Sequence, residues 1–341
     1  MDQGLSTATT LGVPSIHRAR FLLGKDRVCM TRVVVTGGAG FIGSHLCEAL
    51  ILRGSEVVCI DDLSTGSEEN IASLLGTRGF SFIRADVSRG LDVEGKIDAV
   101  LHLASPASPP AYLRRPLETL AVGSRGTEAA ISLAARHGAR FIMASTSEVY
   151  GDPAVHPQPE SYWGNVNPIG VRSVYDEAKR FSEALTMAYG RERKVDVGIV
   201  RIFNTYGPRL RAGDGRVVSN FVSQALSGEP LTVYGDGSQT RSFCYIDDLV
   251  SGLLAMVDSD VSGPINLGNP AEYSVSALAD MVIELTGSKS KVITQPLPAD
   301  DPVRRCPDIS TAKRLLGWEP VTDLVTGLER TIDWFRSEMK S

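Results

Sequence analysis

Short runs of aliphatic and β-branched residues alternate with longer stretches in which apolar residues recur at helical spacing, beginning at residue 31. Residues 33–35 are all valine, and an uninterrupted apolar run is typical of a strand that is covered on both faces. A glycine-rich turn follows, and residues 44–53 then show the helical period. Repetition of this unit predicts an α/β fold with a parallel, doubly wound sheet.

Five more segments have the composition of buried strands, and they are separated by helical stretches. They are residues 56–60, 80–83, 99–103, 140–144 and 197–202. Beyond Phe203, glycine and proline interrupt the chain every few residues, as in residues 235–237 and 296–298. This change predicts a smaller, loop-rich domain over the carboxyl ends of the strands, where ligands of such sheets bind.

The two predicted domains interleave, because two later segments repeat the pattern of the first. We expect a helix at 245–257 and a strand at 264–268 that return to the large sheet. The larger domain is therefore assigned to residues 31–203 with 243–268, and the smaller one to residues 204–242 with 269–341. Residues 1–30 lack the pattern, and we expect a disordered extension there.

Composition excludes several classes of protein. The 341 residues are 43% hydrophobic with a net charge of −5, and the mean hydropathy is −0.01. Such a chain has a core to bury and is not an acidic disordered protein. It lacks the basic field that binds nucleic acid, and no apolar run approaches the ~20 residues of a membrane span. We therefore expect neither nucleic acid nor a membrane as a partner.

The five cysteines are scattered, and their number is odd. No CxxC pair occurs, and no histidine stands at metal-ligand spacing from a cysteine. This pattern predicts a reducing, cytoplasmic setting and no metal site.

A glycine motif lies between the first strand and the first helix. Residues 36–43 read Thr-Gly-Gly-Ala-Gly-Phe-Ile-Gly. A plain strand-to-helix turn would explain glycines alone, but Asp61 stands 21 residues after Gly40, at the end of the second strand. Such an acid accepts hydrogen bonds from ribose hydroxyls and repels a 2′-phosphate. We therefore predict a Rossmann domain that binds NAD rather than NADP.

A second motif carries chemistry. Tyr175 and Lys179 are four residues apart in a helical stretch, so they share a helix face. An ammonium group beside the phenol would lower the tyrosine pKa and make it a base. An isolated pair of this kind is most often a surface Tyr with a solvated Lys. Here, residues 144–151 bring Ser and Thr hydroxyls to the end of a predicted strand.

Together these motifs resemble the extended short-chain dehydrogenase/reductase family, which works on nucleotide sugars. The resemblance runs from about residue 32 to residue 335. Further segments look like the subfamily that decarboxylates UDP-glucuronate. They are residues 104–110, 145–153, 162–170, 204–209, 214–221, 235–243 and 300–309.

The resemblance implies a reaction cycle. Tyr175 takes the proton of the sugar C4 hydroxyl while NAD takes the C4 hydride, and CO2 leaves from the resulting 4-keto acid. C5 is then protonated and the hydride is returned, giving UDP-xylose. Glu148 is implied as a proton-transfer group whose charge disfavours the substrate carboxylate, with Arg305 as its partner. Ser147 stands where related 4,6-dehydratases carry an Asp.

The resemblance also implies the residues of the site, none of which binds a metal. The catalytic set is Thr146, Ser147, Glu148, Tyr175, Lys179 and Arg305. The NAD-binding set is Gly37, Gly40, Phe41, Ile42, Gly43, Asp61, Asp62, Ser64, Thr65, Gly66, Asp86, Val87, Leu103, Ala104, Ser105, Tyr175, Lys179, Arg211 and Arg216. The substrate-binding set is Ala107, Tyr112, Thr146, Glu148, Tyr175, Asn204, Val217, Thr232, Tyr234, Arg241 and Arg305.

Two further expectations follow from the resemblance. A homodimer would pair through helices at about 113–137 and 173–191. Relatives often carry Lys and Asn where this chain has Ala121 and Gly123, so any substrate contact from that helix is not carried over. Three alternatives stay open: a UDP-hexuronate 4-epimerase, an oxidative enzyme that stops at the 4-keto pentose, and a catalytically silent sensor of nucleotide sugars.

Overall fold

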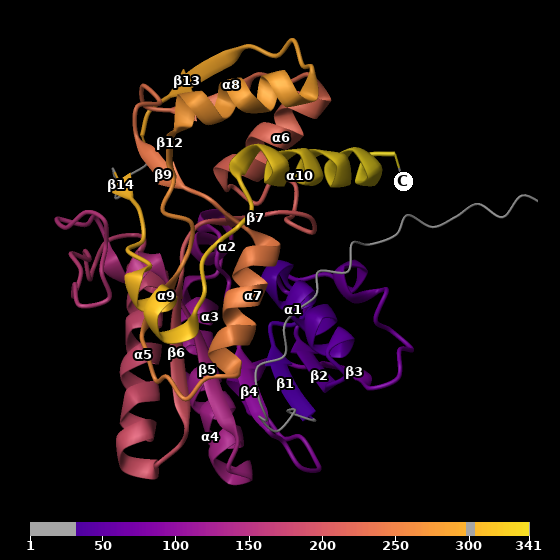
Figure 1. The fold of residues 1–341 in the computed structure, drawn as a ribbon, viewed down its shortest axis with the longest axis vertical. Helices are drawn as coiled ribbons and strands as arrows, with labels where there is room; N and C mark the ends of the chain where they lie inside the picture. Colours follow the sequence, from indigo (N-terminus) through magenta and orange to yellow (C-terminus); the bar gives the residue numbers. More distant parts are fainter. Residues whose placement is uncertain (1–31, 298–303, 341) are drawn as a thin grey trace, which may run out of the picture.

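A seven-stranded sheet forms the centre of the computed structural model, which describes residues 32–297 and 304–340. All its strands are parallel, in the order β11-β6-β5-β4-β1-β2-β3 (Figure 1). Its strands are β1 (Arg32–Thr36), β2 (Glu56–Asp61), β3 (Phe80–Arg84), β4 (Ala99–His102), β5 (Arg140–Thr146), β6 (Val197–Ile202) and β11 (Ile265–Leu267). The doubly wound α/β fold predicted from the sequence is confirmed, including the late strand β11.

Helices cover both faces of this sheet. Val33 and Val35 of β1 pack in one cluster with α1 (Phe41–Leu52) and α7 (Ile246–Val257). Val34 faces the other way, into a cluster with residues of α4 (Thr127–His137) and α5 (Ser173–Arg193). Burial on both faces explains why the strand residues are apolar without alternation.

The helix predicted at 113–137 is divided by a π-turn at Val122–Gly126, which follows α2 (Pro109–Arg114) and α3 (Pro116–Ala121). A Cβ atom on Gly123 would lie 2.6 Å from the Cβ of Ala178 in α5. Ser182 of α5 also donates a hydrogen bond of 2.7 Å to the Gly123 carbonyl. Glycine at this position therefore permits a close approach of the two helices that a larger residue would prevent.

A smaller lobe lies over the carboxyl ends of the central strands (Figure 1). It contains a three-stranded sheet in the order β12-β9-β14 and the parallel pairs β13-β8 and β10-β7. The strands are β7 (Thr205–Tyr206), β8 (Leu231–Tyr234), β9 (Thr240–Ser242), β10 (Cys244–Tyr245), β12 (Glu272–Ser274), β13 (Val292–Gln295) and β14 (Arg304–Arg305). The remaining helices are α6 (Val217–Ser227), α8 (Val275–Thr286), α9 (Ser310–Leu316) and α10 (Leu324–Glu338), and short 3₁₀ turns span Glu68–Ile71, Val87–Arg89 and Ser147–Tyr150.

Helix α9 crosses the boundary between the predicted domains. It comes from the segment assigned to the smaller domain, yet it packs against β11 and α7 of the larger one (Figure 1). The exact domain limits stay a prediction. Among the helices of the described residues, none has the length and apolar character that crossing a bilayer requires.

Candidate active site

A cavity of about 1200 Å³ runs along the carboxyl ends of the central strands. The glycine-rich loop after β1 and the end of β2 line one part of it, and residues at the ends of β4, β5 and β6 line the rest. Trp334 and Phe335 of α10 lie on its other side. Every residue predicted to contact NAD lines this cavity. Their individual roles stay predictions.

The glycine-rich loop is shaped for close approach. Gly37 has a φ of +72°, and a Cβ there would lie 2.6 Å from the amide nitrogen of Ala104. A Cβ on Gly43 would overlap the carbonyl oxygen of Gly37. Gly40 precedes α1 and provides no side-chain cap, so the first amides of the helix are free to bind an anion. The loop fits the pyrophosphate of a dinucleotide.

Asp61 ends β2 at the edge of the same cavity. One carboxylate oxygen accepts from the amide of Ala39 at 3.0 Å, and the other accepts from the amide of Leu63 at 2.8 Å. Burial raises the pKa of Asp61 from its usual value. These bonds hold the carboxylate beside the glycine loop, where it can accept hydrogen bonds from a ribose diol. The cavity therefore fits NAD, as the sequence predicted.

Tyr175 and Lys179 lie on α5 as predicted, but their electrostatics differ from the expectation. Burial raises the pKa of Tyr175 to about 12, although a hydrogen bond with Thr146 opposes the shift. Lys179 Nζ donates to the Ala144 carbonyl at 2.7 Å and lies 5.9 Å from the centre of the Tyr175 ring. Because burial outweighs the favourable contacts of the phenol, the predicted lowering of the tyrosine pKa is wrong for the protein alone. Burial also lowers the pKa of Lys179 to about 8.

Glu148 lies in the turn after β5, between two arginines. Its carboxylate oxygens lie 2.7 Å from Arg172 Nη2 and 2.5 Å from Arg305 Nη1. Burial favours the neutral acid, but the two guanidinium groups prevail and hold the pKa of Glu148 at about 2. That the charge of Glu148 disfavours the substrate carboxylate stays a prediction, and the two guanidinium groups offset that charge. Glu148 with its two arginines carries a net positive charge.

Arg305 also binds the turn that carries Glu148. It donates to the Ser147 hydroxyl at 3.3 Å and to the Gly151 carbonyl at 3.1 Å, and it is only 2% exposed. Thr146 accepts from the Glu148 amide at 3.2 Å and so caps the turn. The structure therefore brings the six predicted catalytic residues together. Sequence reasoning missed Arg172, which belongs to none of the motifs and precedes α5 by one residue.

Three of the buried side-chain atoms that lack a hydrogen-bond partner among the described residues lie at this cluster. They are the Tyr112 hydroxyl, Asp176 Oδ1 and Arg305 Nε. Tyr112 stacks on Tyr175 with ring centroids 5.1 Å apart. Buried polar groups ordinarily have partners. Their grouping here favours a site that a polar ligand completes.

Asp176 gives a stability prediction. Burial first, and then the charge of Glu148, raise the pKa of this carboxyl from 3.8 to about 7. A folded-state pKa above the unfolded value means that stability is lost as pH rises between about 4 and 7. Asp176→Asn should therefore raise Tm by several degrees at pH 8 and change it little at pH 4. Thermal melts at both pH values check this, and an equal shift at both would contradict it.

Only some of the residues predicted to bind the substrate line the cavity. Ala107, Thr146, Glu148, Tyr175 and Asn204 line it. Tyr112 and Arg305 lie behind it, in contact with Tyr175 and Glu148. The other four predicted residues do not line it: Val217 begins α6, Thr232 and Tyr234 lie on β8, and Arg241 lies on β9. Their binding roles stay predictions.

Three arginines of the segment between β6 and α6 line the cavity. They are Arg209, Arg211 and Arg216. Arg209 contacts Glu48 at 2.5 Å, and Arg216 contacts Asp214 at 2.9 Å. Arg201 instead forms a two-pronged ion pair with Glu183, which fixes β6 to α5.

Known proteins share the sequence and the fold of this chain. Residues 33–268 match the NAD dependent epimerase/dehydratase family. The chain is 50% identical over 338 residues to UDP-glucuronic acid decarboxylase 1 of Xenopus tropicalis. The aligned region covers 99% of this chain and 78% of the relative. It is 52% identical over 317 residues to UDP-glucuronic acid decarboxylase 1 of Arabidopsis thaliana, which covers 93% and 72% of the two chains.

A solved structure with bound ligands has the same fold. It is UDP-glucuronic acid 4-epimerase from Bacillus cereus in complex with UDP-glucuronic acid and NAD. The superposition has a TM-score of 0.80 at 30% identity and covers 90% of this chain and 100% of that chain. The fold of the central sheet and of the lobe above it is thus one that holds a dinucleotide and a nucleotide sugar together.

Proposed function

The chain belongs to the NAD dependent epimerase/dehydratase family, and within it we infer that the protein converts UDP-glucuronate to UDP-xylose and CO2. Relatives from a frog and a plant that share half of its residues are UDP-glucuronic acid decarboxylases. The observation in the site that carries the inference is Glu148, held by Arg172 and Arg305 on the cavity of Tyr175. Charged groups beside the reacting sugar can bind and orient its C6 carboxylate.

The first step belongs to Tyr175, which removes the proton of the C4 hydroxyl. NAD, which Gly37, Gly40 and Asp61 would hold, supplies when bound a hydride acceptor for C4 and a positive charge that favours the phenolate. The Thr146 hydroxyl shares a hydrogen bond with Tyr175 and can hold the same sugar oxygen. Burial of Tyr175 at 5% exposure keeps bulk water from competing for the proton.

The second step uses the charges around Glu148. Oxidation at C4 places the C6 carboxylate β to a ketone, so the C5–C6 electron pair can move into the C4 carbonyl as CO2 leaves. Tyr175, now protonated, donates to the enolate oxygen and stabilises it. Arg172 and Arg305 attract the carboxylate before it leaves. C5 then gains a proton that originates from solvent, directly or through a group that exchanges with it.

Mass spectrometry together with proton NMR of the reaction products tests this function. Purified protein with UDP-glucuronate in D2O should release CO2 and form a UDP-pentose that carries one deuterium at C5. UDP-galacturonate as the product would instead identify a 4-epimerase. One equivalent of NADH released for each CO2 would identify an enzyme that stops at the 4-keto pentose. Either result, or no turnover with NAD bound, would contradict the proposal.

We also propose that the protein is a homodimer paired through α3, α4 and α5. The support is an exposed apolar surface on these elements and on α2 beside them, with Leu113 47%, Leu117 76% and Phe181 50% exposed. Leu117→Lys should give a monomer in light scattering of the purified protein. Leu52→Lys is the matched control, since Leu52 is 81% exposed on α1, and it should remain a dimer. A monomeric parent protein would contradict the proposal.

A reducing, cytoplasmic setting is likewise our proposal. The cysteines of the described residues, Cys47, Cys59, Cys244 and Cys306, are all free and buried. Burial raises the pKa of Cys244, and neighbouring thiols and burial raise that of Cys47, so these groups are held as thiols. Thiol titration of protein denatured directly from cells should find all five cysteines reduced. A value of three or fewer would contradict the proposal.

A further inference from the structure

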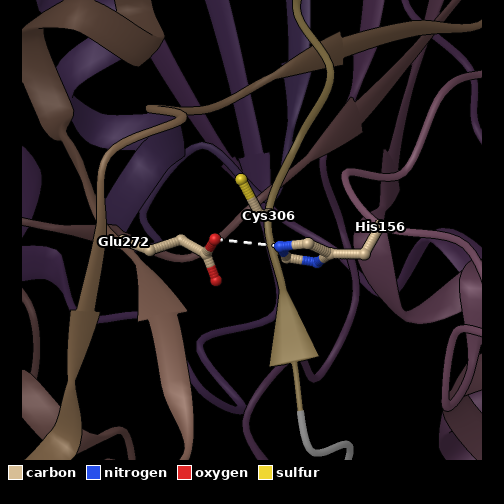
Figure 2. Close-up of side chains that lie close together, drawn as sticks. All are labelled: His156, Glu272 and Cys306. Atoms are coloured by element: carbon tan, nitrogen blue, oxygen red, sulfur yellow. Dashed lines mark hydrogen bonds and ion pairs between the residues drawn. The ribbon is translucent and has the colours of Figure 1, made fainter.

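Three side chains from separate parts of the chain meet away from the large cavity. Figure 2 shows His156 and Glu272 directed toward each other, with the Cys306 side chain beside them. His156 Nε2 lies 2.9 Å from Glu272 Oε2, and one potential ligand atom of each residue lies within 4.8 Å of the others. Within residues 32–297 and 304–340, this is the group of His, Cys and carboxylate side chains that is close enough to hold a metal ion.

We propose that His156, Glu272 and Cys306 form a binding site for a zinc ion. A thiolate, an imidazole and a carboxylate are the ligand types that zinc takes, at about 2.0–2.3 Å. Tetrahedral geometry at those lengths separates the ligand atoms by roughly 3–4 Å. The three ligand atoms, which now lie within 4.8 Å of one another, therefore reach that separation by small side-chain rotations. With three protein ligands, water takes the fourth position.

The surroundings of the three side chains hold them in place. The Gln158 side-chain oxygen accepts from the backbone amide of Cys306 at 2.9 Å. The backbone amide of Gln158 donates to the Cys306 carbonyl at 2.9 Å. The second carboxylate oxygen of Glu272 accepts from the Thr240 hydroxyl at 2.7 Å. Partners that orient the ligands are typical of zinc sites. Here they fix the cysteine backbone and the glutamate before any ion arrives.

The site is open to ions on one side and buried on the other. The side chains of His156 and Glu272 are 27% and 28% exposed, whereas Cys306 is 2% exposed. Zinc therefore enters from solvent past the histidine and displaces the proton of the thiol, and His156 binds it through Nε2 with the ring proton on Nδ1. Without an ion, the thiol donates weakly to the Pro270 carbonyl at 3.4 Å. A hydrogen bond between His156 and Glu272 is the simpler role for these two residues, and it predicts no effect of Cys306 on zinc affinity.

Occupation of the site would clamp the strand that carries Arg305. Cys306 directly follows Arg305, which contacts Glu148, and Glu272 begins β12 of the same three-stranded sheet. His156 lies in the loop after the Glu148 turn. One zinc ion would thus join that loop to both edges of the sheet. We expect bound zinc to raise Tm by several degrees.

The test uses the full chain without a histidine tag, stripped with a chelator and saturated with NAD. Isothermal titration with ZnCl2 should show one ion bound per chain. Cys306→Ser and His156→Gln should each weaken binding at least about tenfold and abolish the rise in Tm. His137→Gln is the matched control, a histidine at the end of α4 outside the cluster, and it should bind zinc as the parent does.

Cobalt(II) separates the proposed site from adventitious binding. A thiolate-to-cobalt charge-transfer band should appear with the parent protein and vanish with Cys306→Ser. Melts without metal show whether each variant is folded, and Glu272→Gln provides a third variant if one is not. Equal zinc affinity in the parent and in folded Cys306→Ser would overturn the proposal, as would a parent protein that binds no zinc.

Discussion

Replacement of Tyr175 by phenylalanine should lower kcat by about a thousandfold, within the range that a positioned general base contributes. The phenol reaches the cavity from α5, beside Thr146 at the end of β5. Its loss leaves no base for the C4 hydroxyl. The ring itself still stacks on Tyr112, so the fold and the affinity for substrate should change little. Single-turnover absorbance should show NADH formation slowed by the same factor as product formation.

Tyr189→Phe provides the control for this prediction. Tyr189 lies on the same helix, and its hydroxyl contacts Ser132 at 3.0 Å, away from the cavity. The substitution removes the same hydroxyl group from the same helix, α5. The kcat should stay within about twofold of that of the parent protein. If Tyr175→Phe turned over at the rate of the parent, the assignment of Tyr175 as the base would be wrong.

Much of the fold follows from local patterns in the sequence. Parallel strands that are buried on both faces give continuous apolar runs, so β1 to β6 could be located before their partners were known. Gly37 has no room for a Cβ beside Ala104 of the loop after β4, Gly43 has none beside the Gly37 carbonyl, and Asp61 ends the neighbouring strand. The carboxyl ends of these adjacent parallel strands lie together, so the residues predicted to contact NAD all line one cavity.

The features that the sequence did not reveal depend on long-range placement. Arg172 belongs to no motif, yet the fold brings it to Glu148, 24 residues away. The tyrosine pKa depends on burial and on where Lys179 points, and spacing along a helix specifies neither. His156, Glu272 and Cys306 come from segments far apart in the chain, so ligand spacing could not suggest a metal site.

The net charge of the chain does not indicate the charge of the ligand, because the fold gathers a few charged residues from distant parts of the chain. The whole chain carries −5, whereas the site concentrates Arg172 and Arg305 around a single Glu148. Coulomb forces in a partly buried site act over a few ångströms and are weakly screened. A local excess of positive charge can therefore attract a small anion to a chain whose net charge is negative.

Glu148→Gln should cause the second large effect, on activity and on stability together. The amide leaves Arg172 and Arg305 buried without the negative charge that lies between them. The folded-state pKa of Glu148 is about 2, below its usual 4.5, so the carboxylate contributes about 3 kcal/mol of stability at neutral pH. That contribution is present above about pH 5 and is lost as pH falls toward 2. Denaturant titrations should show the largest difference from the parent at pH 7 and a shrinking one at pH 3.

Activity distinguishes a residue that positions the arginines for catalysis from one that only stabilises the fold. The variant should lose about a hundredfold or more in kcat for CO2 release, because Arg172 and Arg305 no longer keep their positions around the turn that reaches the cavity. Glu183→Gln is the matched control. Glu183 is 14% exposed against 19% for Glu148, and it pairs with Arg201 outside the cavity. Its replacement should cost similar stability but less than tenfold in kcat. Equal losses of activity in the two variants would show that Glu148 acts only by holding the fold together.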